Sequence, residues 1–235
     1  MLPLLLPWNP AKPLRVLFLG AHCDDIEIGC GGTVLQLVAS RPDVEVRWVV
    51  FASNPQRERE ARASAAMFLR GAGAQEVTVH AFRDGFFPYQ GGQIKEAFEA
   101  LKGQADPDLI FTHYRDDRHQ DHRTISDLTW NTWRHHLILE YEIPKYDGDL
   151  GSPNCFVPLE PDVCERKAAC ICEAFQSEHN KAWLTPDTFL ALMRLRGVEC
   201  AARYAEAFHC RKFMLRGAPD RVAPGNSPHP STRSS

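Results

Sequence analysis

The sequence predicts an α/β domain with a mainly parallel sheet and helices on both faces. Short apolar segments of strand length alternate with longer amphipathic segments over residues 15–112, which is the rhythm of parallel strands joined by crossover helices. Glycines and an Asp-Pro-Asp sequence separate these segments, as turns do. The composition, with 44% hydrophobic and 24% charged residues in a chain of 235, is that of a globular domain that can bury its own core.

Each strand expected in the first half is followed by a segment of different character. The apolar run 15–19 is the first strand, and a loop at 20–32 precedes a short helix. The Arg-, Glu- and Ala-rich segment 53–69 has the pattern of an amphipathic helix, which Gly71 and Gly73 end. In full, we expect strands over 15–19, 44–51, 76–82 and 109–112, and helices over 33–38, 53–69 and 94–102.

The alternation becomes less regular after about residue 120. We expect a helix within 119–133, a strand over 137–143, a loop over 144–158, helices over 162–175 and 186–204, and a final strand or extended segment over 207–215. A single domain over residues 1–216 accounts for these elements. Residues 217–235 are rich in Pro, Ser and Gly and have little to bury, so we expect a disordered tail.

Charge and hydropathy exclude several classes of protein. The formal net charge of −3 argues against a nucleic-acid binder, which needs a basic surface. No apolar run approaches the ~20 residues of a membrane span. The first residues are apolar but interrupted by prolines and lack a positive segment, unlike a signal peptide. We therefore expect a cytoplasmic protein whose eight cysteines, which form no C-x-x-C pair, are reduced.

Two polar stretches follow the first and fourth expected strands, at residues 21–27 and 113–122. Ligands of such sheets bind beyond the carboxyl ends of the strands, where both stretches would lie. His22 and Asp25 are three residues apart, and so are His119 and His122. Two histidines and a carboxylate are a typical catalytic zinc set, which leaves a position for water.

Other acidic residues of the same two stretches remain for further roles. Asp24 would lie next to the metal without binding it, where a general base belongs. Asp117 and Asp121 lie near His119 in sequence and are suited to orient an imidazole. An Asp pair in a loop is usually a cap or a turn, and a single His is usually structural. The occurrence of both stretches at strand ends favours the metal interpretation.

The glycines after the first stretch do not indicate a dinucleotide site. Gly29-x-Gly31-Gly32 lacks the G-x-G-x-x-G spacing of such loops. We interpret these glycines as positions that let a helix N-terminus approach the sheet or a ligand closely.

Residues 22–33, His-Cys-Asp-Asp-Ile-Glu-Ile-Gly-Cys-Gly-Gly-Thr, resemble the first motif of the LmbE-like (PIG-L) deacetylases. His119-Gln120-Asp121-His122 resembles their second motif. The resemblance implies a Rossmann-like three-layer domain with C-terminal helices. It also implies zinc-dependent hydrolysis of the N-acetyl group of an N-acetylglucosamine conjugate, giving acetate and a free amino sugar.

The resemblance assigns roles to the matching residues. His22, Asp25 and His122 would bind one zinc ion, with other divalent metals as alternatives. Asp24 would be the general base, and protonated His119 would assist the transition state, with Asp121 as the carboxylate partner that holds it in this form. The sequence departs from the motifs at Cys23 and Gln120, where the family usually has Pro. A fourth ligand or an oxidation-sensitive thiol at Cys23 remains open.

Two weaker matches concern the substrate. Arg57, in an Arg-x-x-Glu-Ala segment, would contact substrate by resemblance, although a solvated helix face explains it as well. Asp84 would bind a sugar hydroxyl, or would simply form an Asp-Gly turn. The polar and aromatic residues around 140–151 are suited equally to a substrate wall and to a contact in a homo-oligomer.

Two other functions compete with N-deacetylation. One is metal-dependent hydrolysis of a different bond, such as another acyl group, an ester or a phosphate. A two-metal phosphatase would need more ligands than the two stretches offer. The other is a non-catalytic module that binds metal or sugar, against which the presence of Asp24 argues.

Overall fold

The computed structural model describes residue 3 and residues 12–214. A sheet with the order β3-β2-β1-β4-β5-β7-β6 runs through the molecule. Its first five strands are parallel, which confirms the mainly parallel sheet. They are β1 (Arg15–Gly20), β2 (Glu45–Ala52), β3 (Ala74–Phe82), β4 (Leu109–His113) and β5 (Leu137–Tyr141). Two antiparallel strands, β6 (Cys155–Leu159) and β7 (Tyr204–His209), complete the edge beside β5.

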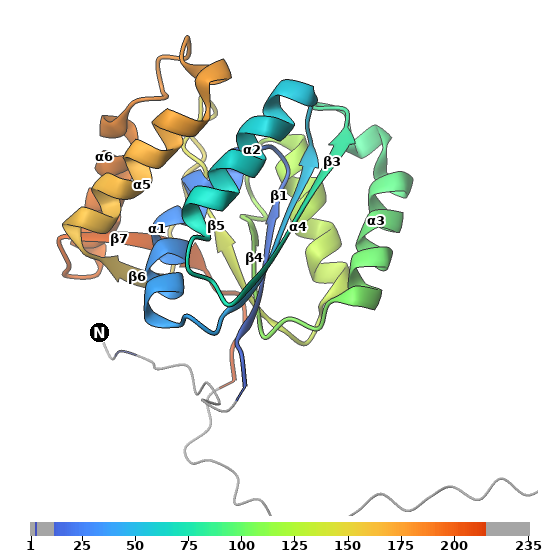
Figure 1. Cartoon of the computed structure of the whole chain (residues 1–235), viewed down its shortest axis with the longest axis horizontal. Helices are drawn as coiled ribbons and strands as arrows, with labels where there is room; N and C mark the ends of the chain where they lie inside the picture. Colours follow the sequence, from blue (N-terminus) through green and yellow to red (C-terminus); the bar gives the residue numbers. More distant parts are fainter. Residues whose placement is uncertain (1–2, 4–11, 215–235) are drawn as a thin grey trace, which may run out of the picture.

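Helices cover both faces of the sheet, so the expected three-layer arrangement is confirmed. One face carries α1 (Asp25–Ser40), α2 (Pro55–Phe68) and α5 (Pro161–Ala174), which contact one another. The other face carries α3 (Gly91–Gln104) and α4 (Gln120–Thr132). Figure 1 shows α6 (Pro186–Glu199) beside α5, at the edge formed by β6 and β7.

Two apolar cores lie on the two faces of the sheet. The larger core joins the sheet to α1, α2 and α5 and includes the stacked rings of Phe18 and Phe111, whose centroids are 4.8 Å apart. The smaller core joins the sheet to α3 and includes Phe51 stacked on Phe98 at 5.0 Å. Each fully buried side chain of this size contributes about 1.5–3 kcal/mol. These cores fix the strand ends from which the polar stretches emerge.

The expected loop at 20–32 is wrong, because α1 already begins at Asp25. The helix is interrupted at Cys30, where φ is −147° and ψ is 18°. Glycines disfavour helix in isolation, but here they permit close packing. A Cβ on Gly29 would lie 2.2 Å from the ring of Tyr141. The expectation that these glycines allow a close approach to the sheet is therefore confirmed.

The second half contains one strand that the sequence analysis missed. β6 begins within the segment 144–158, which was expected to be a loop, and ends at Leu159. The helix expected to reach residue 204 ends at Glu199, and β7 follows. β6 pairs with β7, a strand far away in sequence, and such a partner is invisible to local patterns.

Three other expectations concern regions or residue types rather than elements. The expected disordered tail lies outside the described residues. All eight cysteines lie within them and are free thiols, as expected. Within residues 12–214 we find no helix of sufficient length and apolarity to span a bilayer.

Candidate metal centre and catalytic cleft

The two polar stretches meet at one edge of the sheet because β1 and β4 are neighbours. Residues 21–24 join β1 to α1, and residues 114–119 join β4 to α4. The helices that follow these two strands cover opposite faces of the sheet. This is the topological switch point at which ligands of open α/β sheets bind.

His22, Asp25 and His122 bring three potential ligand atoms together. His22 Nδ1 lies 3.1 Å from His122 Nε2 and 3.4 Å from an Asp25 oxygen. The other Asp25 oxygen lies 3.4 Å from His122 Nε2. Tetrahedral zinc with ligand distances of about 2.0–2.1 Å separates its donors by about 3.3 Å. These spacings are close to that value, with a different Asp25 oxygen facing each imidazole, so the three residues are suited to hold a divalent ion.

Both imidazoles are held by carboxylates at their second nitrogen. His122 Nδ1 is 2.9 Å from Asp117 Oδ2, and His22 Nε2 is 3.0 Å from Asp84 Oδ1. Lys145 Nζ donates to the same Asp117 oxygen at 2.9 Å. Such carboxylates fix the tautomer and orientation of metal-binding histidines. The outer contacts therefore leave one nitrogen of each ring free to face the centre.

Asp121 differs from its expected position beside His119. Its carboxylate accepts hydrogen bonds from the backbone N–H groups of Gly85, at 2.7 Å, and Phe87, at 3.1 Å. One of its oxygens also lies 3.4 Å from His22 Nε2. Of the described contacts, it is the backbone N–H of Asp121 that reaches His119 Nδ1, at 3.3 Å. The Asp121 carboxylate thus supports His22 and the turn at Gly85.

The surroundings of His119 favour a neutral ring, in contrast to the expected protonated form. Burial lowers its pKa, and the nearby His122 lowers it further. Since Nδ1 accepts a backbone hydrogen bond, the ring proton of the neutral form belongs on Nε2. His119 lines the cleft described below, so this N–H is available to a ligand there.

Asp24 is buried and paired with Arg57. The distance from Arg57 Nη2 to Asp24 Oδ2 is 3.0 Å. Burial raises the pKa of Asp24, and the Arg57 guanidinium opposes this shift. Arg57 also reaches Glu60 and Glu178, at 3.4 and 3.7 Å. Arg57 is therefore part of the site and not a solvated helix face.

Cys23 makes a hydrogen bond away from the three ligand candidates. Its thiol donates to the carbonyl of Ala52, at the end of β2, at 3.3 Å. Burial raises the pKa of the thiol to about 12, although Arg57 acts in the opposite direction. A neutral thiol bonded in this way is a poor metal ligand.

His113 is a site residue to which the sequence analysis gave no role. Its Nε2 accepts a hydrogen bond from Ala21 N–H at 2.9 Å and lies 3.1 Å from an Asp25 oxygen. Its ring stacks on that of His122, with centroids 4.0 Å apart. A buried histidine at a strand end has the sequence signature of a core residue. Only its position opposite Asp25 identifies it as a support of the centre.

A cleft of about 620 Å³ opens over these residues. Pro144 and Lys145 form part of its wall, whereas the side chain of Tyr146 is 82% exposed. The segment after β5 therefore contributes to the cleft through its first residues. The cleft is also lined by His22, Asp24, Asp25, Arg57, Phe82, Arg83, Asp84, His119, His122, Glu178, Lys181 and Trp183.

A protein-family model, PIG-L, described as GlcNAc-PI de-N-acetylase, matches residues 17–133. The matched segment extends from β1 to the end of α4. It contains both polar stretches and every candidate ligand. Residues 134–214, which form β5 to β7 and two helices, lie beyond it.

Solved structures of similar fold cover most of the chain. The conserved protein TT1542 from Thermus thermophilus is 21% identical, with a TM-score of 0.67 over 86% of this chain and 97% of that one. The N,N'-diacetylchitobiose deacetylase from Pyrococcus horikoshii is 21% identical, with a TM-score of 0.66 over 83% and 82%.

A hydratase, whose reaction differs from that of the deacetylase above, has a similar fold. GalB, the 4-carboxy-2-hydroxymuconate hydratase from Pseudomonas putida, is 14% identical, with a TM-score of 0.66 over 88% of this chain and 99% of that one. A fold alone does not determine a reaction. The site residues must therefore carry the functional argument.

Proposed function

Because the chain belongs to the PIG-L family and is a hydrolytic deacetylase, we propose that it removes the N-acetyl group from an N-acetylglucosamine conjugate at a single zinc ion. The observation that carries this proposal is the convergence of His22, Asp25 and His122, with donor atoms 3.1–3.4 Å apart, beside the unligated carboxylate of Asp24. A divalent ion held there would lower the pKa of water to about 7 and polarise a carbonyl oxygen.

Asp24 is the proposed general base. Its carboxylate lines the cleft next to the ligand Asp25 and takes a proton from the water that attacks the amide carbon. Burial raises its pKa, which makes the carboxylate a better proton acceptor. The Arg57 guanidinium, 3.0 Å away, keeps it oriented and ionised before the reaction.

His119 is the proposed donor to the developing oxyanion. Its neutral ring presents Nε2–H to the cleft, because Nδ1 is occupied by the backbone N–H of Asp121. Oxyanion donors of this kind contribute about 3–4 kcal/mol in other enzymes. The leaving amine takes the proton that Asp24 removed from the water, because a neutral His119 has no acidic proton to give. The products are acetate and the free amino sugar. Asp121 acts indirectly, by holding His22.

Two residues of the cleft wall are proposed to contact the sugar. The exposed Asp84 carboxylate, which has one oxygen 3.0 Å from His22 Nε2, offers its other oxygen to a sugar hydroxyl. Arg57 reaches the substrate from the Asp24 side of the cleft. Zinc is proposed because the donors are two imidazoles and a carboxylate, although such sites also accept other divalent metals.

The test measures free-amine release from a panel of N-acetylglucosamine conjugates, using protein that has been stripped with a chelator and reloaded with zinc. We expect activity to disappear with the metal and to return on reloading. A matched panel of O-acetyl sugars distinguishes amide from ester hydrolysis. Stoichiometric zinc binding without amine release from any conjugate would contradict the proposed reaction, and release that survives complete metal removal would contradict the metal site.

A further inference from the structure

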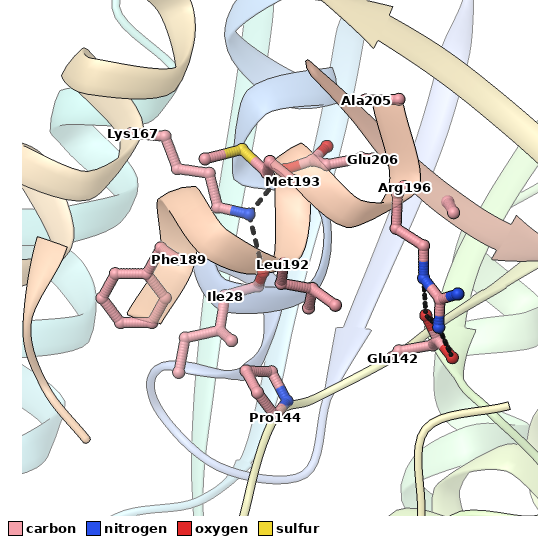
Figure 2. A pocket seen from close by; sticks show the side chains of 12 residues that line it. Ile28, Glu142, Pro144, Lys167, Phe189, Leu192, Met193, Arg196, Ala205 and Glu206 are labelled. Carbon is pink, nitrogen blue, oxygen red and sulfur yellow. Dashed lines mark hydrogen bonds and ion pairs between the residues drawn. The ribbon is translucent and has the colours of Figure 1, made fainter. Parts of the chain in front are cut away.

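A buried ion pair from the C-terminal part of the chain lies against the interrupted helix α1. Lys167 of α5 and Glu206 of β7 are 2% and 4% exposed, and Lys167 Nζ is 2.7 Å from Glu206 Oε1. Figure 2 shows this pair beside Ile28, with Lys167 donating both to Glu206 and to the Ile28 carbonyl. The adjoining cavity holds only about 20 Å³, too little for a substrate.

Both charges are bonded to backbone groups at the break in α1. The Ile28 carbonyl accepts from Lys167 Nζ at 2.7 Å. The two Glu206 oxygens accept from the backbone N–H groups of Gly32, at 2.7 Å, and Thr33, at 2.6 Å. In an uninterrupted helix, the Gly32 N–H would donate to the Ile28 carbonyl four residues earlier. The ion pair replaces this bond: the Ile28 carbonyl accepts from Lys167, and the Gly32 N–H donates to Glu206.

The insertion interrupts the helix immediately after the turn that carries Asp24 and Asp25. The Ile28 N–H donates to the Asp24 carbonyl at 3.0 Å, which closes this turn. The far end of the same turn is the Ile28 carbonyl, which Lys167 holds. Side chains inserted into the helical hydrogen-bond ladder change the direction of a helix at that point. The pair therefore fixes the orientation of this first turn relative to the rest of α1.

We infer that Lys167 and Glu206 are positioning residues, which hold the Asp24–Ile28 turn so that Asp25 can bind the metal together with His22 and His122. This inference rests on the proposed metal site. It gives a role in the site to two residues that lie outside the matched segment 17–133. Neither residue contacts substrate or metal itself. Their effect passes through the backbone of the turn.

The stability of the single and double variants must be known before their zinc affinities can be interpreted. Loss of one partner leaves a buried charge unpaired, so Lys167→Met and Glu206→Leu should each lower Tm by about 10 °C. The double variant Lys167→Met/Glu206→Leu removes both charges and allows the Gly32 N–H to bond Ile28 in a continuous helix. Replacing a buried pair by apolar residues often preserves stability. Its Tm should therefore recover most of the loss.

The deciding measurement is zinc affinity, obtained by competition with a chromophoric chelator in the full-length wild type and double variant. If the pair positions the turn, the double variant binds zinc at least about tenfold more weakly although its Tm is restored. The visible spectrum of the cobalt-loaded protein should change in band position or intensity, because the donor geometry has changed. Phe98→Ala is the control, because Phe98 lies in the other core. It should lower Tm and leave zinc affinity unchanged.

Three results would overturn this inference. One is wild-type zinc affinity and an unchanged cobalt spectrum in the double variant. Another is a loss of affinity in Phe98→Ala as large as that in the double variant, which would show that general destabilisation weakens the site. If the wild type bound no zinc, the proposed metal site would fail and the positioning role with it, whereas the first two results leave the proposed function intact.

Discussion

The segment up to residue 133 and the segment that follows it contribute to the site in different ways. The first supplies the ligand candidates His22, Asp25 and His122 from two short stretches at the ends of β1 and β4. The second supplies no candidate ligand of that centre within the described residues, but it supplies a partly buried cation, Lys145, and a buried one, Lys167. Lys145 contacts Asp117, and Lys167 contacts the turn that precedes the break in α1.

This difference reflects two kinds of physical requirement. A zinc ion needs donor atoms about 3.3 Å apart, and two short stretches provide them. Holding those donors in place needs contacts from whatever packs behind them. Such contacts come from α5, β7 and the segment after β5, which are remote from one another in sequence. The reactive residues are therefore clustered in the sequence, whereas their supports are scattered.

The largest expected effect comes from removing a ligand. His122→Ala should abolish stoichiometric zinc binding, measured by elemental analysis after gel filtration, and turnover with it. The reason is that only two of the three donors remain. His136→Ala is the control, because this half-buried histidine lies near Asp106, away from the cleft. A full equivalent of zinc in His122→Ala would remove His122 from the ligand set.

The next effect separates catalysis from metal binding within the first segment. Asp24→Asn should reduce kcat by about 10²–10⁴-fold while one zinc ion stays bound, because the amide cannot accept a proton from water. Asp116→Asn, on the loop after β4, is a matched control with an exposed carboxylate and should retain activity. Wild-type turnover by Asp24→Asn would contradict the general-base assignment.

A smaller effect is expected at the contact between Asp117, from the first segment, and Lys145, from the second. Asp117→Asn should weaken zinc binding by about 10–100-fold, because its carboxylate orients His122. Lys145→Met, which leaves Asp117 bonded to His122, should weaken binding less. Chelator competition measures both. Equal losses of zinc affinity in the two variants would mean that Lys145 contributes as much to zinc binding as Asp117.

The smallest effect concerns stability. Gly29→Ala should lower the free energy of unfolding by about 1–3 kcal/mol, because its Cβ would lie 2.2 Å from the Tyr141 ring. Gly103→Ala, in α3 with no heavy atom within 4 Å of a new Cβ, should be neutral or stabilising by up to about 1 kcal/mol. Urea unfolding of both variants tests the pair. A neutral Gly29→Ala would show that the helix and the sheet can separate there without cost.

The sequence alone was sufficient to predict the three-layer α/β fold, the two polar stretches and their meeting at one edge. Alternation of apolar and amphipathic segments is a local property, and the parallel topology then brings the ends of β1 and β4 together. The spacing of His22 and Asp25, and of His119 and His122, likewise predicts metal ligands in these stretches, and that assignment stays a prediction.

Tertiary structure alone decided which partner each side chain has. It placed the Asp121 carboxylate against His22 and the Gly85 turn, and it made His113 a neighbour of Asp25. It also paired β6 with β7, which brings Glu206 to the break in α1. These contacts join residues far apart in sequence or depend on side-chain direction. Local propensity carries no information about distant partners or about side-chain direction. The free energy of such contacts arises only when the whole sheet has formed.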